Sequence, residues 1–318
     1  MRTAIVLTFL FAVTSAIGQT NWKVNRSAGG PDLVTVYFTS SEKGWIAGDN
    51  GYLASTVDGG KTWMKKEIGS DDTINEVYFR NDENGYLVAG RRMLITRDGG
   101  ISWQETQINR PNEFRGLTPE YLSIKFADKR RGIVVGSLLN KQERVVDSLV
   151  MLTENGGETW KRVIVPSKKE LFHLDFVGSN RCWVVGDDGL ILFSEDGGAR
   201  FTAQKSGTVL DLYNVDFRDE NEGYAVGSRG TILRTDSGGA VWETVRTSLQ
   251  TTFMRVDFAD DKNGMIVGYD GTILRSTDKG RTWTKQVSRT SDHLYGLFFV
   301  KKYGWAVGAK GTVIQYDR

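Results

Sequence analysis

The sequence predicts an all-β fold, a seven-bladed β-propeller with four-stranded antiparallel blades, and three observations support this. A short apolar motif recurs seven times, a loop rich in Gly and Asp follows most copies, and the two chain ends supply complementary parts of one copy. Four short strands in each repeat of about 40 residues are typical of propeller blades. We therefore expect one ring of similar sheets.

The apolar motif is a predicted strand that begins at Gly or Cys and closes at a glycine. Its closing glycines are mostly 40 to 42 residues apart. Each copy follows another strand-like segment, such as 212–217, and precedes a turn and a third strand, such as 230–234. The seven copies are 44–48, 85–90, 132–136, 182–186, 223–227, 264–268 and 304–308.

The loop after the third strand, here called the box, reads Thr-Val-Asp-Gly-Gly-Lys-Thr-Trp at 56–63. Its hydroxyl and carboxylate can accept backbone N–H groups and fix a tight turn, while the tryptophan packs between sheets. Other boxes carry Asn155 or Ser237 in place of Asp, and Phe201 in place of Trp. A catalytic carboxylate would not tolerate this exchange, so we interpret the boxes as structural.

The seventh copy ends at 316–318, after its third strand and before any box. The segment 19–24 contains Trp22 and matches the strand that follows a box tryptophan. The sequence therefore predicts that the N-terminal strand closes the ring.

The first 18 residues are expected to be a secretory signal peptide, because Arg2 precedes a short apolar run and small residues follow. Residues 19–318 are then expected to form a single propeller domain in the periplasm or outside the cell. No cysteine lies at the expected cleavage point for a lipid anchor. Cys182, the one cysteine, is predicted to be a buried thiol, and the net charge of +2 does not favour nucleic acid.

Two insertions, 104–120 and 137–148, break the regular period, and both belong to the third blade. By topology they lie on one face, beside the turn of the second blade, and such insertions often form binding sites. We define the basic patch as the cations of these segments, which could bind a carboxylate, a phosphate or an acidic protein segment. The alternative is a solvated surface, partly neutralised by Glu113, Glu120, Glu143 and Asp147. The patch comprises Arg91, Arg92, Arg110, Arg115, Lys141 and Arg144.

The Gly-aromatic-x-Val-Gly strands at 223–227 and 304–308, together with the boxes, resemble the photosystem II stability/assembly factor family over residues 21–318. The resemblance implies a non-catalytic lumenal or periplasmic propeller whose arginine-rich surface holds a photosystem subunit. It implies a protein partner, such as an acidic segment or a membrane-protein subunit. We expect a monomer without cofactor, metal, nucleic acid or direct membrane insertion. The plain leader, without transit segment or anchor cysteine, does not by itself imply a photosynthetic partner.

A sialidase-like glycoside hydrolase acting on extracellular glycans is the alternative function, because similar boxes occur in sialidases. The candidate acids are Asp49, Asp187, Asp188 and Asp270 in predicted turns, and Asp175, Asp216 and Asp257 in predicted first strands. Their regular recurrence favours a structural role, and the Arg-hydrophobic-Pro motif of sialidases is absent near the first blade. His173 and His293 are predicted to lie too far apart to share a metal.

Overall fold

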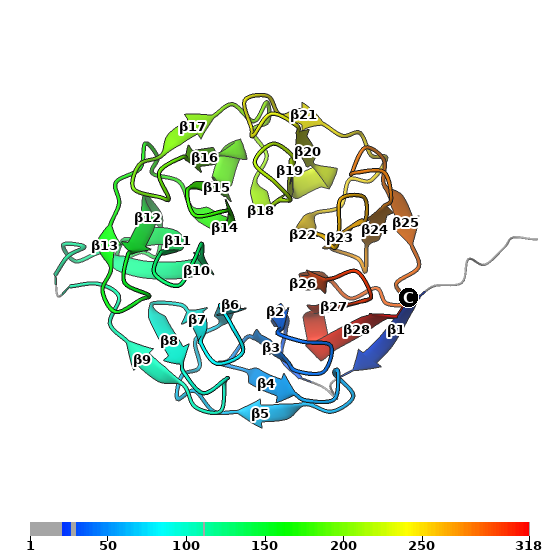
Figure 1. The fold of residues 1–318 in the computed structure, drawn as a ribbon, viewed down its shortest axis with the longest axis horizontal. Coiled ribbons are helices and arrows are strands. Elements are labelled where there is room, and N and C mark those ends of the chain that lie inside the picture. Colours follow the sequence, from blue (N-terminus) through cyan, green and yellow to red (C-terminus); the bar gives the residue numbers. More distant parts are fainter. Residues whose placement is uncertain (1–20, 27–29, 111, 318) are drawn as a thin grey trace, which may run out of the picture.

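The computed structural model describes residues 21–26, 30–110 and 112–317, and these residues form the predicted seven-bladed propeller (Figure 1). Seven four-stranded antiparallel sheets surround a central channel, and neighbouring strands within each sheet are consecutive in sequence except at the closing blade. The expected signal peptide lies outside the described residues. In the described part of the chain, no helix is both long and apolar enough to cross a membrane.

The strands follow the chain blade by blade, from the channel outward. Blades one to three comprise β2 (Leu33–Phe38), β3 (Gly44–Gly48), β4 (Leu53–Thr56), β5 (Met64–Lys66); β6 (Ile74–Phe79), β7 (Gly85–Ala89), β8 (Arg92–Thr96), β9 (Gln104–Thr106); and β10 (Thr118–Phe126), β11 (Gly132–Leu139), β12 (Val145–Thr153), β13 (Lys161–Arg162). Blades four and five comprise β14 (Leu171–Val177), β15 (Arg181–Gly186), β16 (Ile191–Ser194), β17 (Thr202–Gln204); and β18 (Leu212–Phe217), β19 (Gly223–Gly227), β20 (Ile232–Thr235), β21 (Glu243–Thr244).

Blade six comprises β22 (Phe253–Phe258), β23 (Gly264–Gly268), β24 (Ile273–Ser276) and β25 (Thr284–Gln286). Blade seven comprises β26 (Leu294–Phe299), β27 (Tyr303–Gly308), β28 (Thr312–Asp317) and the N-terminal β1 (Trp22–Arg26). In the described part of the chain, three single-turn 3₁₀ helices lie in strand 2–3 turns: η1 (Asp187–Gly189), η2 (Ser228–Gly230) and η3 (Ala309–Gly311).

The core lies between the blades, where aromatic rings of successive sheets stack. Phe38, at the end of β2, stacks on Trp305 of blade seven with ring centroids 3.5 Å apart. Its own blade contributes Gly44, and a Cβ there would lie 2.4 Å from the Phe38 ring. The motif therefore begins with a small residue because the last aromatic residue of the inner strand occupies the space.

The boxes are the structural turns that the sequence predicts. In the first box the Thr56 hydroxyl accepts the Gly60 N–H at 3.0 Å, and the Asp58 carboxylate accepts the Thr62 N–H at 2.9 Å. Asn155 accepts the corresponding N–H of Thr159 at 3.0 Å through its amide oxygen. Either side chain completes the turn, and this explains why the exchange is tolerated.

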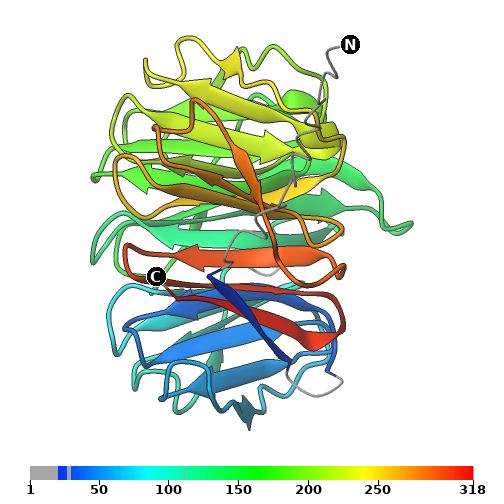
Figure 2. The ribbon, with the colours of Figure 1, turned by 90° about the vertical axis from the view of Figure 1, so that its right-hand side faces the viewer.

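The ring closes through the N-terminal strand, as predicted. β1 pairs antiparallel with β28, with Trp22 opposite Tyr316 and Arg26 opposite Thr312 (Figure 2). The Trp22 side chain is 1% exposed. Segments almost 300 residues apart thereby share one sheet.

Two details differ from the sequence-based expectation. In blade two the register places Ala89, not Gly90, at the closing position of the motif, because a tight turn at Gly90 and Arg91 follows it directly. In blade three the insertion at 137–148 is largely strand, since β11 and β12 extend far beyond the other blades and leave only 140–144 as a turn. Cys182 is buried, as predicted.

Candidate functional site

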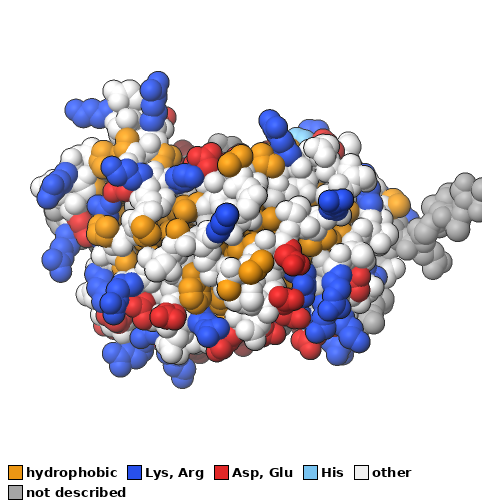
Figure 3. All heavy atoms as spheres, turned by 90° about the horizontal axis from the view of Figure 1, so that it is seen from above, with side chains coloured by type: hydrophobic (Ala, Val, Ile, Leu, Met, Phe, Trp, Pro, Cys, Tyr) orange, Lys and Arg blue, Asp and Glu red, His pale blue; other side chains and the backbone are white. Residues whose placement is uncertain are grey.

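The three segments that carry the basic patch lie side by side on one face of blades two and three. The Tyr121 N–H, in β10, donates to the Gly90 carbonyl of the β7–β8 turn at 2.7 Å. Phe114, in the β9–β10 link, is buried in a cluster with Tyr121 and Leu138. The β11–β12 hairpin projects from this face (Figure 2), and its tip carries Lys and Arg side chains (Figure 3). The predicted adjacency of the segments is confirmed.

The patch cations fall into two kinds. Arg92 is half-buried and anchored, with its guanidinium 3.7 Å from the Asp72 carboxylate and 3.6 Å from that of Glu105. The remaining cations are exposed, and none has an ion-pair partner among the described residues. These free cations are Arg91, Arg110, Arg115, Lys141 and Arg144.

The acids that were expected to neutralise the patch form no ion pairs with it within the described residues. The Glu113 carboxylate accepts the backbone N–H of Arg110 at 2.8 Å. Asp147 pairs with Arg162 of β13 at 2.6 Å. Burial raises the pKa of Glu120, and the nearby Glu143 charge adds to the effect. The alternative of a neutralised surface is therefore weakened, although binding by the patch stays a prediction.

The second candidate site is the central channel, which sequence reasoning did not identify as a site. Every inner strand has a bulge after its first buried residue, and beyond it two residues per blade face the axis. The register gives a first ring of Thr35, Glu76, Ser123, His173, Asn214, Arg255 and Gly296. A second ring consists of Tyr37, Tyr78, Lys125, Asp175, Asp216, Asp257 and Phe298.

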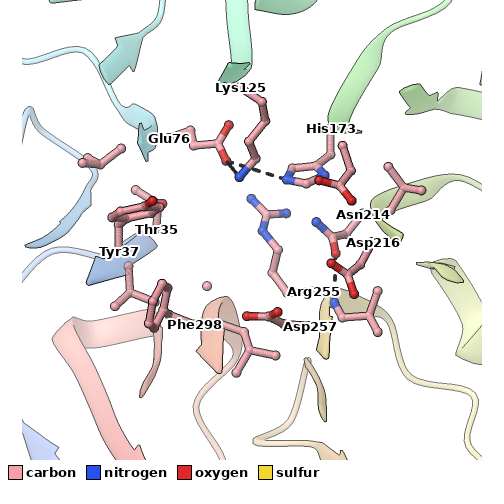
Figure 4. A pocket seen from close by; sticks show the side chains of 17 residues that line it. Thr35, Tyr37, Glu76, Lys125, His173, Asn214, Asp216, Arg255, Asp257 and Phe298 are labelled. Carbon is pink, nitrogen blue, oxygen red and sulfur yellow. Dashed lines mark hydrogen bonds and ion pairs between the residues drawn. The ribbon is translucent and has the colours of Figure 1, made fainter. Parts of the chain in front are cut away.

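The channel holds a cavity of about 170 Å³ whose lining is asymmetric. Tyr37 and Phe298 form an aromatic side, and Asp216 and Asp257 form an acidic side opposite the Glu76 region (Figure 4). The Arg255 side chain extends from β22 into the space between them (Figure 4). The blades therefore contribute different side chains to the channel, although their folds are alike.

A buried ion pair bridges blades two and three within the channel wall. The Lys125 ammonium lies 2.9 Å from the Glu76 carboxylate, which also accepts the Ser123 hydroxyl at 2.6 Å and the Ile124 N–H at 2.7 Å. Burial alone would raise the pKa of Glu76, but the Lys125 charge and the hydrogen bonds outweigh it and hold that pKa well below its usual range. Glu76 is therefore ionised and fully engaged.

The carboxylates on the acidic side of the channel are largely buried, and some of them accept hydrogen bonds from the backbone of the next blade. Asp175 accepts the Phe217 N–H of the next blade at 2.8 Å, and Asp257 accepts the Phe299 N–H at 2.8 Å. These bonds confirm the structural interpretation of Asp175 and Asp257. Burial raises the pKa of all three carboxyls, most strongly that of Asp216, and mutual repulsion with its neighbours adds to the rise.

The channel also contains an imidazole, that of His173, and the guanidinium of Arg255. Burial lowers the pKa of His173 to about 4, although the Glu76 carboxylate lies 3.7 Å from its Nε2. Burial also lowers the pKa of Arg255, which donates to the Met254 carbonyl at 3.1 Å. Among the described residues, no group of three or more His, Cys, Asp or Glu side chains is arranged to hold a metal.

The raised pKa of Asp216 predicts a stability change that depends on pH. Because this pKa is raised, the carboxyl binds its proton more tightly in the folded state than in the unfolded state. The free energy of unfolding therefore decreases as pH rises from about 4 through the pKa of the folded state. We expect Asp216→Asn to raise the free energy of unfolding at pH 8 by on the order of 1 kcal/mol, with the gain disappearing near pH 4. Urea denaturation at several pH values measures this difference. Asp71→Asn, at an exposed position, is the matched control, and a gain equal at all pH values would contradict the prediction.

The family comparison supplies the identity of this propeller. The model of the family described as "Photosynthesis system II assembly factor YCF48" matches residues 67–169, 164–236, 201–285 and 248–317, well over half of the chain. The chain belongs to this family. The resemblance drawn from the repeat motifs is thus confirmed.

Individual YCF48 proteins and other propellers show how far the likeness extends. A photosystem II assembly lipoprotein Ycf48 of Prochlorococcus marinus is 33% identical over 58 residues, which are 18% of this chain and 17% of the relative. The structure "YCF48 bound to D1 peptide" has a TM-score of 0.76 at 22% identity and covers 95% of this chain and 99% of its own. A GH74 xyloglucanase of Xanthomonas campestris has a TM-score of 0.70 at 12% identity, covering 93% of this chain and 53% of its own, and thus shares the fold alone.

Proposed function

We propose that this protein is a non-catalytic, secreted scaffold or assembly factor that binds a protein segment at the basic patch. Membership of the YCF48 family supports an assembly role, and the solved homologue with a bound D1 peptide is an example of a YCF48 propeller that binds a peptide. The periplasm or the exterior of the cell is the proposed location, on the strength of the leader-like N-terminus.

The observation that carries the proposal is the set of exposed patch cations without ion-pair partners among the described residues. The unpaired guanidinium groups are available to carboxylates, because no internal salt bridge must break first. Arg92 is already bound to Asp72 and Glu105, so its expected role is to support the turn that presents Arg91. An acidic segment is the partner chemistry that fits this surface.

Charge reversal of the free cations tests the proposal. We expect Arg91→Glu, Arg110→Glu and Arg115→Glu together to weaken binding of a labelled D1 peptide by more than tenfold, measured by fluorescence anisotropy. The control changes three exposed cations elsewhere, Lys205, Arg246 and Lys285, to Glu and should bind the peptide nearly as well as the wild type. Equal loss in both triple variants would indicate only a general charge effect and would contradict a specific patch.

The glycosidase alternative has a separate test. The channel acids that could have served a hydrolase include Asp175 and Asp257, which instead accept backbone N–H groups of the neighbouring blades. We therefore expect no turnover of a panel of chromogenic glycosides. Turnover that is lost in an Asp257→Asn variant with an unchanged fold would overturn the non-catalytic proposal.

A further inference from the structure

A small cavity of about 230 Å³ lies between blades two and three on the side of the ring that carries the boxes. The topology places this side opposite the strand 2–3 turns and the basic patch. Its walls include Arg80 and Asn84 of the β6–β7 turn, Arg97 of the second box and Lys129 of the β10–β11 turn. Glu158 of the third box is the one acidic residue in the lining. The cavity therefore combines three cations with a single carboxylate.

The same place between blades five and six contains an internal ion-pair network. The Glu222 carboxylate contacts the Arg218 guanidinium and lies 3.5 Å from the Lys279 ammonium and 3.8 Å from Arg234 Nη2. The Glu222 side chain is only 17% exposed. In this pair of blades, a carboxylate supplied by the chain itself thus occupies the centre of a cluster of cations.

The repeat allows the two places to be compared position by position. Residues 79–86 correspond to 217–224, because each segment runs from the final Phe of the inner strand through Arg to a Gly-Tyr pair. Arg80 therefore corresponds to Arg218, but Asn84 stands where the other pair has Glu222. Blades two and three keep the central arginine and lack its carboxylate. Two cations that surround Glu222 are also absent from blades two and three. Ile95 occupies the position equivalent to Arg234, and Gly156 occupies the position equivalent to Lys279.

Two further exchanges make the cavity more positive. Lys129 stands where blade six has Asp261, and Arg97 stands where blade five has Asp236. In blades five and six these acids lie 3.8 Å from Arg218 and 3.6 Å from Arg234, respectively. Blades two and three thus have cations at both of these positions. Among the described residues, the exchanges leave three cations around a space in which Glu158 is the single acidic lining residue.

We propose that this cavity binds a carboxylate group from outside the chain, in the place that Glu222 occupies between blades five and six. Arg80 is held for this role, because its Nη1 donates to the Lys129 carbonyl at 2.6 Å and its guanidinium lies over the Phe126 ring at 5.8 Å. Gly156 keeps the space open, since a Cβ there would lie 3.0 Å from the Lys129 carbonyl and 3.4 Å from Arg80 Nη1. The volume suits a small carboxylic acid or one acidic side chain of a peptide.

The test compares proteins with and without a carboxylate side chain at position 84. Wild-type protein should bind glutarate, or a blocked Gly-Glu-Gly peptide, in isothermal titration calorimetry, and chloride at equal ionic strength should not substitute. We expect Asn84→Glu to reduce this binding at least tenfold, because its own carboxylate fills the site, and to raise the melting temperature without ligand. Asn84→Gln, whose new side chain is as long as that of Glu but uncharged, should bind like the wild type.

Titrations with different ligands distinguish a free acid from an acidic side chain, and a carboxylate from other anions. Binding of glutarate alone identifies a small free acid, and binding of the Glu peptide but not its Gln counterpart identifies an acidic side chain; either result supports the proposal. Binding of phosphate or sulfate without any carboxylate would overturn it, as would equal titration curves for Asn84→Glu and Asn84→Gln. Reversal of Arg91, Arg110 and Arg115 should leave this binding intact, so the site is tested separately from the proposed partner surface.

Discussion

Replacing Trp22 with Ala should lower the free energy of unfolding by about 3–5 kcal/mol, as large-to-small substitutions of buried tryptophans do. The Trp22 ring is almost completely buried, packs against Tyr316 with centroids 5.3 Å apart, and belongs to a cluster with Met265 and Leu294. That cluster joins blades six and seven to the N-terminal strand. Loss of the indole therefore leaves a cavity at the closure of the ring.

Urea denaturation followed by fluorescence measures the loss. Lys23→Ala is the control, because Lys23 is an exposed neighbour on the same strand, and its effect should stay within about 0.5 kcal/mol. Deleting the chain through Arg26 should have a larger effect, since β28 would become an open edge prone to intermolecular pairing. A deletion variant that is monomeric and as stable as the wild type would show that the ring does not depend on its closing strand.

The fold could be predicted from the sequence because every blade repeats the same local requirements. Gly44 and its equivalents leave space for an aromatic ring, and the boxes close the same turn with side-chain oxygens of a hydroxyl, amide or carboxylate. Closure was predictable for a related reason, since the missing fourth strand of blade seven has its counterpart around Trp22. Repeated local constraints of this kind reinforce one another.

The channel was not predictable in the same way, because its residues differ from blade to blade. Asp175, Asp216 and Asp257 recur and were interpreted as structural, whereas Lys125 occupies the equivalent position of blade three with the opposite charge. Its partner Glu76 lies in the other ring, where no two blades carry the same residue. An alignment of the seven inner strands with their shared bulge would have placed all of these side chains on one axis. The basic patch, in contrast, was found through its insertions, and only the structure distinguishes anchored Arg92 from the exposed cations.

Removing one member of the buried Glu76–Lys125 pair should destabilise the propeller by about 3–5 kcal/mol, because the remaining charge would lie in the channel wall without its counter-ion. We expect this loss for Glu76→Gln, which also weakens acceptance of the Ser123 hydroxyl and the Ile124 N–H. Glu76→Gln combined with Lys125→Met should cost less than the sum of the single changes. Urea denaturation of the four proteins in this cycle gives the coupling energy.

The exposed pair Lys65–Glu67, at a similar distance of 3.0 Å, is the matched control, and solvent screening should keep its coupling below about 1 kcal/mol. The pH dependence follows from the directions of the two pKa changes. Stability from Glu76, whose pKa is lowered, is present above about pH 4 and is lost as pH falls; stability from Lys125, whose pKa is raised, is present below about pH 10 and is lost as pH rises. The coupling should therefore be constant from about pH 5 to pH 9. A coupling no larger than that of the surface pair would mean that this ion pair adds nothing to the packing and the hydrogen bonds that join blades two and three.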